Sequence, residues 1–149
     1  MSAALTLARP EHLERLVAMS GAFAEEMELP SDPDQRGAAL LPLLEGSPHG
    51  AAYLIGPARA PVGYLVVSFG WSLEFGGLDG FIDEIYIRPA VRGRGMATEV
   101  LIALPKALAG AGLRALHLEV DKTDTKTQRL YAKVGFALRD RYQLMTRAL

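Results

Sequence analysis

The change of hydrophobic period in the middle of the chain restricts its fold more than any other feature. Residues 80–87, GFIDEIYI, form the short apolar run of a β-strand. From Arg94 the apolar residues recur at helical spacing, and this pattern stops at the glycines at 110 and 112. A second strand, LRALHLEV at 113–120, follows the helix. A strand, a long helix and another strand imply a parallel crossover, so we predict a mixed α/β fold.

The rest of the chain adds short elements but no internal repeat or linker. Pro10 suits the first turn of a helix, which Gly21 is expected to break, and Pro105 should kink the central helix. The other expected elements are a strand at 5–7, a loop at 29–35, a short helix at 37–45, a hairpin of strands at 51–56 and 62–69, a helix at 125–134 and two short strands at 136–149.

Composition excludes several classes of protein. The 149 residues suit one domain, expected over 1–149, and the formal net charge of -1 lacks the basic excess of a nucleic-acid binder. The absence of cysteine excludes a disulfide scaffold, a zinc-thiolate site and a cysteine nucleophile. The chain starts without a basic segment before an apolar run, and no stretch approaches about 18 apolar residues. We therefore expect a soluble cytoplasmic domain without a membrane partner.

The segment RPAVRGRGMA at 88–97 has the properties of a phosphate-binding loop. Its glycines let the backbone approach a ligand closely, and the following helix start offers free N–H groups and a positive dipole end. Arg92 and Arg94 add positive charge. A plain turn with solvated arginines explains the same spacing. The chain has neither the P-loop pattern nor the dinucleotide-binding pattern in a first βαβ unit.

Three segments together resemble one known family. The run RGRGMA at 92–97 looks like the R-x-x-G-x-[GA] loop of the GNAT superfamily of N-acetyltransferases. IDEIYIRP resembles the fourth strand of that family, and LYAKVGF resembles its Y-x-x-x-GF element. The likeness runs from Phe81 to Phe136, and among subfamilies it is nearest to diamine and small-amine acetyltransferases. It implies a twisted, mostly antiparallel sheet flanked by helices, with a cleft between two central parallel strands.

The resemblance also implies acetyl-coenzyme A as cosubstrate. The loop backbone would hold the pyrophosphate, while residues 85–87 would pair with the pantetheine amides as another strand does. The strand at 113–120 would splay from the fourth strand to make room. The implied cofactor-binding residues are Ile85, Tyr86, Ile87, Arg92, Gly93, Arg94, Gly95, Met96, Ala97, Thr98, Asp124, Thr127 and Tyr131. The family often has Asn and Ala where this chain has Asp124 and Thr127.

Three residues are candidates for the chemistry of acyl transfer to an amine. Tyr131 occupies the position of the family's tyrosine, whose neutral hydroxyl can protonate a thiolate; a packed core tyrosine is the alternative. Asp83 and Glu84 lie on an otherwise apolar strand, where a carboxylate is costly unless it is paired or functional. Their side chains should point to opposite faces, although a bulge could exchange their directions. Either is the candidate base, and a structural salt bridge is the alternative for one of them.

The sequence gives weaker indications of the residues that would bind the acceptor amine. Glu25 and Glu26 lie where the family's first helices cover the acceptor, and Glu74 lies in the loop WSLEF. An acidic rim would favour a cationic amine, and a solvated helix face explains the run equally well. His117 shares a strand face with Glu119, where it could relay a proton or simply pack. No histidine or carboxylate cluster has metal-ligand spacing, so no metal is expected.

These observations predict an N-acetyltransferase that moves the acetyl group of acetyl-coenzyme A directly to a primary amine of a small, cationic molecule in a ternary complex. A protein or peptide N-acetyltransferase and a catalytically silent acyl-coenzyme A-binding module are the alternatives. A homodimer is the expected assembly.

Overall fold

The computed structural model describes residues 3–149, and these form two compact units. The first unit ends at Glu119, and the second spans Val120–Leu149. Each unit is described separately. No helix among residues 3–149 is long and apolar enough to cross a membrane.

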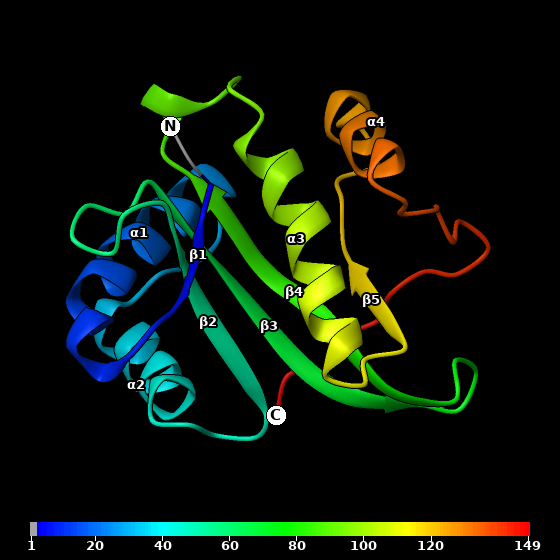
Figure 1. The fold of residues 1–149 in the computed structure, drawn as a ribbon, viewed down its shortest axis with the longest axis horizontal. Coiled ribbons are helices and arrows are strands. Elements are labelled where there is room, and N and C mark those ends of the chain that lie inside the picture. Colours follow the sequence, from blue (N-terminus) through cyan, green and yellow to red (C-terminus); the bar gives the residue numbers. More distant parts are fainter. Residues whose placement is uncertain (1–2) are drawn as a thin grey trace. The chain divides into compact units, whose positions relative to one another are not determined.

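The first unit is built on one five-stranded sheet with the strands in sequence order (Figure 1). Three of its four strand pairs are antiparallel, and β4 pairs with β5 in parallel. The mostly antiparallel mixed sheet confirms the predicted class. The expectation of two central parallel strands is wrong for the described residues, because β5 lies at the edge of this sheet. The strands are β1 (Leu5–Leu7), β2 (Gly50–Ile55), β3 (Gly63–Ser72), β4 (Gly77–Ile87) and β5 (Ala115–Leu118).

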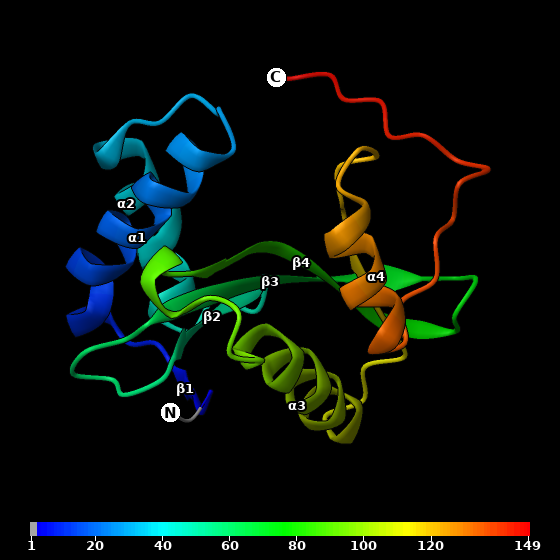
Figure 2. The ribbon, with the colours of Figure 1, turned by 90° about the horizontal axis from the view of Figure 1, so that it is seen from above.

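Helices cover both faces of this sheet, as predicted. Figure 2 shows α1 and α2 on one face and α3 on the other. Apolar residues of α1 and α2 pack on β2, β3 and β4, with Leu16, Met19 and Tyr64 among the most buried side chains. The bounds are η1 (Pro10–His12), α1 (Leu13–Glu26), α2 (Pro33–Leu44), η2 (Pro89–Val91) and α3 (Met96–Gly110).

Two helix boundaries differ from the sequence-based expectations. Helix α1 is continuous through Gly21, so the expected break does not occur. Helix α2 begins at Pro33, inside the stretch expected to be a loop, because the Asp32 side chain accepts a hydrogen bond from the Asp34 N–H and caps the helix. Proline at the first helical position also favours this start.

The second unit contains one regular element, α4 (Thr125–Lys133). Two residues after Lys133 the chain leaves this helix through Gly135, whose φ of 102° is left-handed, and the Phe136 N–H donates to the Tyr131 carbonyl at 3.0 Å. The prediction of two strands at 136–149 is wrong, since residues 137–149 form no strand. An isolated two-stranded hairpin is marginal in water, which explains why the alternating sequence alone does not produce one.

Candidate active site

A β-bulge in β4 shapes the centre of the candidate site. Val66 of β3 pairs with Glu84, but the next residue, Val67, pairs with Ile82, so Asp83 is an extra residue in β4. Such a bulge bends the strand and re-aims its side chains. Asp83 and Glu84 consequently line the same cavity. The bulge considered as an alternative is therefore present, and it interrupts the alternation that would send the two side chains to opposite faces.

Glu84 is the paired carboxylate of the two. Its Oε1 accepts hydrogen bonds from the Ser20 hydroxyl at 3.1 Å and from the Tyr64 hydroxyl at 2.8 Å, and Arg36 Nη1 forms an ion pair with its Oε2 at 3.1 Å. Arg36 also donates to the Ser20 hydroxyl. Both partners of the ion pair are only 16% exposed. Glu84 therefore has the structural salt bridge that was considered for one of the two residues.

Three partners of Glu84 were missed by the sequence analysis. Ser20, Arg36 and Tyr64 come from α1, α2 and β3, between 20 and 64 residues away from Glu84 in sequence. No local pattern connects them. The one available indication was the cost of a carboxylate on an apolar strand, which requires a partner somewhere in the fold.

Asp83 differs from Glu84 in that it keeps contact with solvent and has no ion pair among residues 3–149. The surrounding protein removes part of the hydration of its carboxyl, and this raises the pKa of Asp83 above its ordinary value. The negative charges of Glu84 and Glu119 raise it further, and Arg36 opposes them. A carboxylate whose pKa lies closer to neutrality is a better general base than an ordinary aspartate.

Substitution of Glu84 is expected to have two measurable effects. Glu84→Gln removes the charge that pairs with Arg36, so we expect a loss of about 2–3 kcal/mol in the free energy of unfolding. It also removes a negative charge next to Asp83, so the pKa of Asp83 should fall. Chemical denaturation measures the first effect, and the acid limb of the kcat/KM profile, which should move to lower pH, measures the second. Wild-type stability in Glu84→Gln would contradict the structural role of this pair.

The loop before α3 has the backbone geometry of an anion site. Gly93 and Gly95 adopt left-handed φ values of 80° and 77°, and a Cβ at either position would meet no atom within 4 Å. Gly95 precedes the first residue of α3, and the Glu99 N–H donates to the Gly95 carbonyl. The N–H groups of the first helical turn before Glu99 have no intrahelical acceptor. Open space in front of free N–H groups suits a phosphate.

The two arginines of this loop have different environments. Arg92 donates to the Ile87 carbonyl at 2.8 Å, forms an ion pair with Glu26 at 2.7 Å and lies over the Tyr86 ring. Its guanidinium is thus held by the end of α1 and the end of β4. Arg94 is exposed on the loop. Glu26, an expected acceptor-binding residue, is brought to the phosphate loop instead.

The end of β4 offers an unpaired strand edge. The parallel ladder with β5 covers Asp79–Ile82 and Ala115–Leu118, and β4 continues to Ile87 with its β3 pairing intact. The edge of residues 83–87 that faces away from β3 has no ladder partner among the described strands. The predicted separation of the two parallel strands therefore begins at the bulge.

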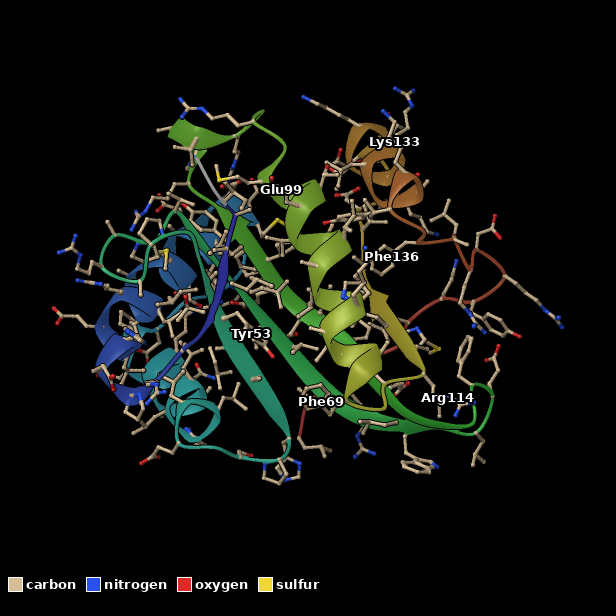
Figure 3. All side chains as sticks on the ribbon, viewed as in Figure 1. Tyr53, Phe69, Glu99, Arg114, Lys133 and Phe136 are labelled. Atoms are coloured by element: carbon tan, nitrogen blue, oxygen red, sulfur yellow. The ribbon has the colours of Figure 1, made fainter. Side chains whose placement is uncertain are left out.

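The other expected acceptor residues do not line the cavity at the bulge. Glu25 is exposed at the end of α1, and Glu74 lies in the turn before β4, an 11-residue strand about 33 Å long. In Figure 3, Glu99 in the first turn of α3 and Arg114 just before β5 lie toward opposite ends of α3. His117 pairs with Asp79 at 3.2 Å and lies against the Phe75 ring, as expected of a packed histidine.

The second unit holds the remaining predicted site residues. Asp124 caps α4 by accepting hydrogen bonds from the Thr127 N–H at 3.0 Å and hydroxyl at 2.6 Å, so both side chains are used within the helix start. Tyr131 packs against Phe136 with ring centroids 6.1 Å apart. Burial and the Asp124 charge raise the pKa of Tyr131 above its ordinary value, so its hydroxyl keeps its proton at neutral pH.

An open strand edge followed by a helix start with free N–H groups suits an extended ligand that carries phosphates, as coenzyme A does. The family model described as "Acetyltransferase (GNAT) family" matches residues 3–136, and the chain belongs to this family. It is therefore an acetyltransferase that uses acetyl-coenzyme A. A comparison with curated protein sequences finds no match. No group of three or more metal-ligating side chains occurs within residues 3–149.

Solved structures show the same fold. An integron cassette protein, HFX_CASS3, from the mobile metagenome of Cole Harbour Salt Marsh is 29% identical, with a TM-score of 0.84 over 97% of this chain and 90% of that one. A possible acetyltransferase from Clostridium difficile 630 has a TM-score of 0.85 at 16% identity, covering 100% and 99%. AAC(6')-Iy, in complex with the bisubstrate analog CoA-S-monomethyl-acetylneamine, has a TM-score of 0.81 at 16% identity, with full coverage of both chains.

Proposed function

We propose that this chain transfers the acetyl group of acetyl-coenzyme A directly to a primary amine of a small cationic molecule. The single observation that carries the choice of acceptor is Asp83, a solvent-accessible carboxylate without an ion pair among residues 3–149 that lines a cavity beside the bulge. An ammonium there would gain a counter-ion and then a proton acceptor. We further propose that the two units act as one catalytic domain, since the family match extends across both.

The loop supports the cofactor half of this proposal. The N–H groups of the first turn of α3 would hold the pyrophosphate, with Gly93 and Gly95 leaving room for it. The unpaired edge at Ile85–Ile87 would hydrogen-bond the pantetheine amides. Acetyl-coenzyme A, when bound, supplies the activated thioester. Tyr131 is the proposed proton donor to the departing sulfur, because its pKa is raised and it stays neutral at pH 7.

Asp83 is tested by the pH dependence of the reaction. In the wild type, kcat/KM should rise as an essential group loses its proton. In Asp83→Asn the rate should fall by about 100-fold at low pH and recover partly at high pH, where the amine is already neutral. The measurement is the pH profile of kcat/KM on the best acceptor from a panel of polyamines, amino acids, aminoglycosides and peptides.

Glu84→Gln serves as the comparison, because it removes the neighbouring carboxylate that is already paired with Arg36. Each variant must be shown to be folded before its rates are interpreted. A well-folded Asp83→Asn enzyme with the wild-type rate and pH profile would exclude this residue as the base. A panel in which only neutral or anionic amines react would remove the cationic acceptor.

A further inference from the structure

A half-open cavity of about 130 Å³ lies between α1, α2 and strands β3 and β4, within the first unit. The exposed residues Ala39 and Asp83 lie where the cavity meets solvent, and Leu40 and Val66 are buried. Its lining residues are Ser20, Arg36, Ala39, Leu40, Leu43, Val66, Asp83 and Glu84.

The lining of this cavity has a polar part and an aliphatic part. Ser20 from the middle of α1, Arg36 from the first turn of α2, and Asp83 and Glu84 at the bulge provide its polar part. The remaining four side chains are aliphatic and come from one side of α2 and from β3. A ligand that satisfies both parts has one charged end and one compact apolar end.

The charges of the polar part balance a single ammonium. Within the cavity lining, Arg36 carries one positive charge and is paired with Glu84, while Asp83 adds one negative charge that forms no ion pair with a described cation. Glu119, outside the lining, adds to the negative field at Asp83. One ammonium at Asp83 would bring the site to neutrality. A second ammonium further along the acceptor would lie among aliphatic side chains, where a charge without a partner is strongly disfavoured.

The volume of the cavity limits the size of the apolar group that the ligand can carry. An engineered cavity of about 150 Å³ lined by aliphatic and aromatic side chains binds benzene. A cavity of about 130 Å³, polar part included, therefore accommodates a whole amine of about this size, such as one with a branched chain of four or five carbons.

We propose that this cavity is the acceptor subsite for a primary monoamine that bears a compact branched aliphatic group, with the ammonium at Asp83 and the apolar group against α2. Residues Ala39, Leu40, Leu43 and Val66 are the specificity-determining side chains. The inference rests on the proposed function and adds to it the class of amine. It distinguishes this chain from an enzyme for linear polyamines, whose second charge the aliphatic wall would exclude.

An amine series tests the proposal with the whole chain and acetyl-coenzyme A. Each buried methylene is worth about fourfold in affinity, so kcat/KM for isopentylamine, which has three more carbons, should exceed that for ethylamine by about 60-fold. The value for 1,4-diaminobutane should be more than tenfold below that for n-butylamine, because its second ammonium would lose its hydration in the apolar part.

A substitution that fills the cavity provides the second readout. Ala39 is exposed at the cavity mouth, so Ala39→Leu should fold normally while reducing the available volume. We expect kcat/KM for isopentylamine to fall more than tenfold and that for ethylamine to stay within about twofold. Ala38→Leu, at an exposed neighbouring position of α2 that does not line the cavity, is the matched control and should change neither value.

The outcomes separate this proposal from the one on which it rests. Equal kcat/KM for ethylamine, isopentylamine and 1,4-diaminobutane would overturn the subsite while leaving amine acetylation intact. A preference for isopentylamine that Ala39→Leu does not alter would also overturn it. Failure of every amine to react, with acetyl-coenzyme A bound, would overturn both.

Discussion

Replacement of Tyr131 by phenylalanine is expected to lower kcat by about 100-fold or more, with little change in the affinity for coenzyme A. The substitution keeps the ring that packs on Phe136 and removes only the hydroxyl. Loss of a general acid typically costs 10²–10⁴-fold. The raised pKa of Tyr131 keeps this hydroxyl protonated at pH 7, so the donor is present throughout the physiological range.

Steady-state kinetics and calorimetric titration with coenzyme A measure the two quantities separately. Tyr53→Phe makes the same kind of change, the loss of a tyrosine hydroxyl, on strand β2. It is the matched control and should behave as the wild type. Near-normal kcat in Tyr131→Phe on the best acceptor would show that this tyrosine only packs against its neighbours.

The second large effect is expected from Gly95→Val, which should weaken coenzyme A binding at least tenfold. A Cβ at this position meets no protein atom within 4 Å, so the new side chain would project into the open space in front of the first turn of α3. That space is where the proposed pyrophosphate would lie. The left-handed φ of 77° adds backbone strain of about 1–2 kcal/mol for a side chain.

Gly112→Val separates the strain from the effect on the ligand. Gly112 also has a left-handed φ, of 102°, and open space around its Cβ, but it follows the other end of α3. Both variants should lose similar stability in thermal unfolding, and only Gly95→Val should lose affinity in calorimetry. Unchanged coenzyme A binding in Gly95→Val would rule out this loop as the pyrophosphate site.

The bulge gives two adjacent carboxylates different chemical environments. Glu84 is held by Arg36, Ser20 and Tyr64, so its charge is neutralised in place. Asp83 has no such partner in the described part of the chain, and its pKa is raised in part by the charge of Glu84. Neighbouring titratable groups whose environments differ in this way can divide the roles of binding and proton transfer.

The loop proposed to hold the pyrophosphate could be predicted from the sequence because it is contiguous. The loop at 88–97 depends on a strand end, two glycines and a helix start, all of which follow from local sequence. The left-handed conformations of Gly93 and Gly95 confirm the geometry that the glycines indicated. As far as α4, the order of elements was equally local, because the hydrophobic period separates these strands from these helices.

The residues of the proposed acceptor site are brought together only by the tertiary structure. The directions of Asp83 and Glu84 depend on the register between β3 and β4, since one extra residue opposite Val66 and Val67 cancels the alternation that the strand sequence implies. The partners of Glu84 come from three separate elements, and only packing brings them together. The aliphatic wall likewise consists of α2 side chains that look like ordinary core positions in sequence, because burial cannot distinguish a core from the lining of a cavity until the neighbouring strand is in place.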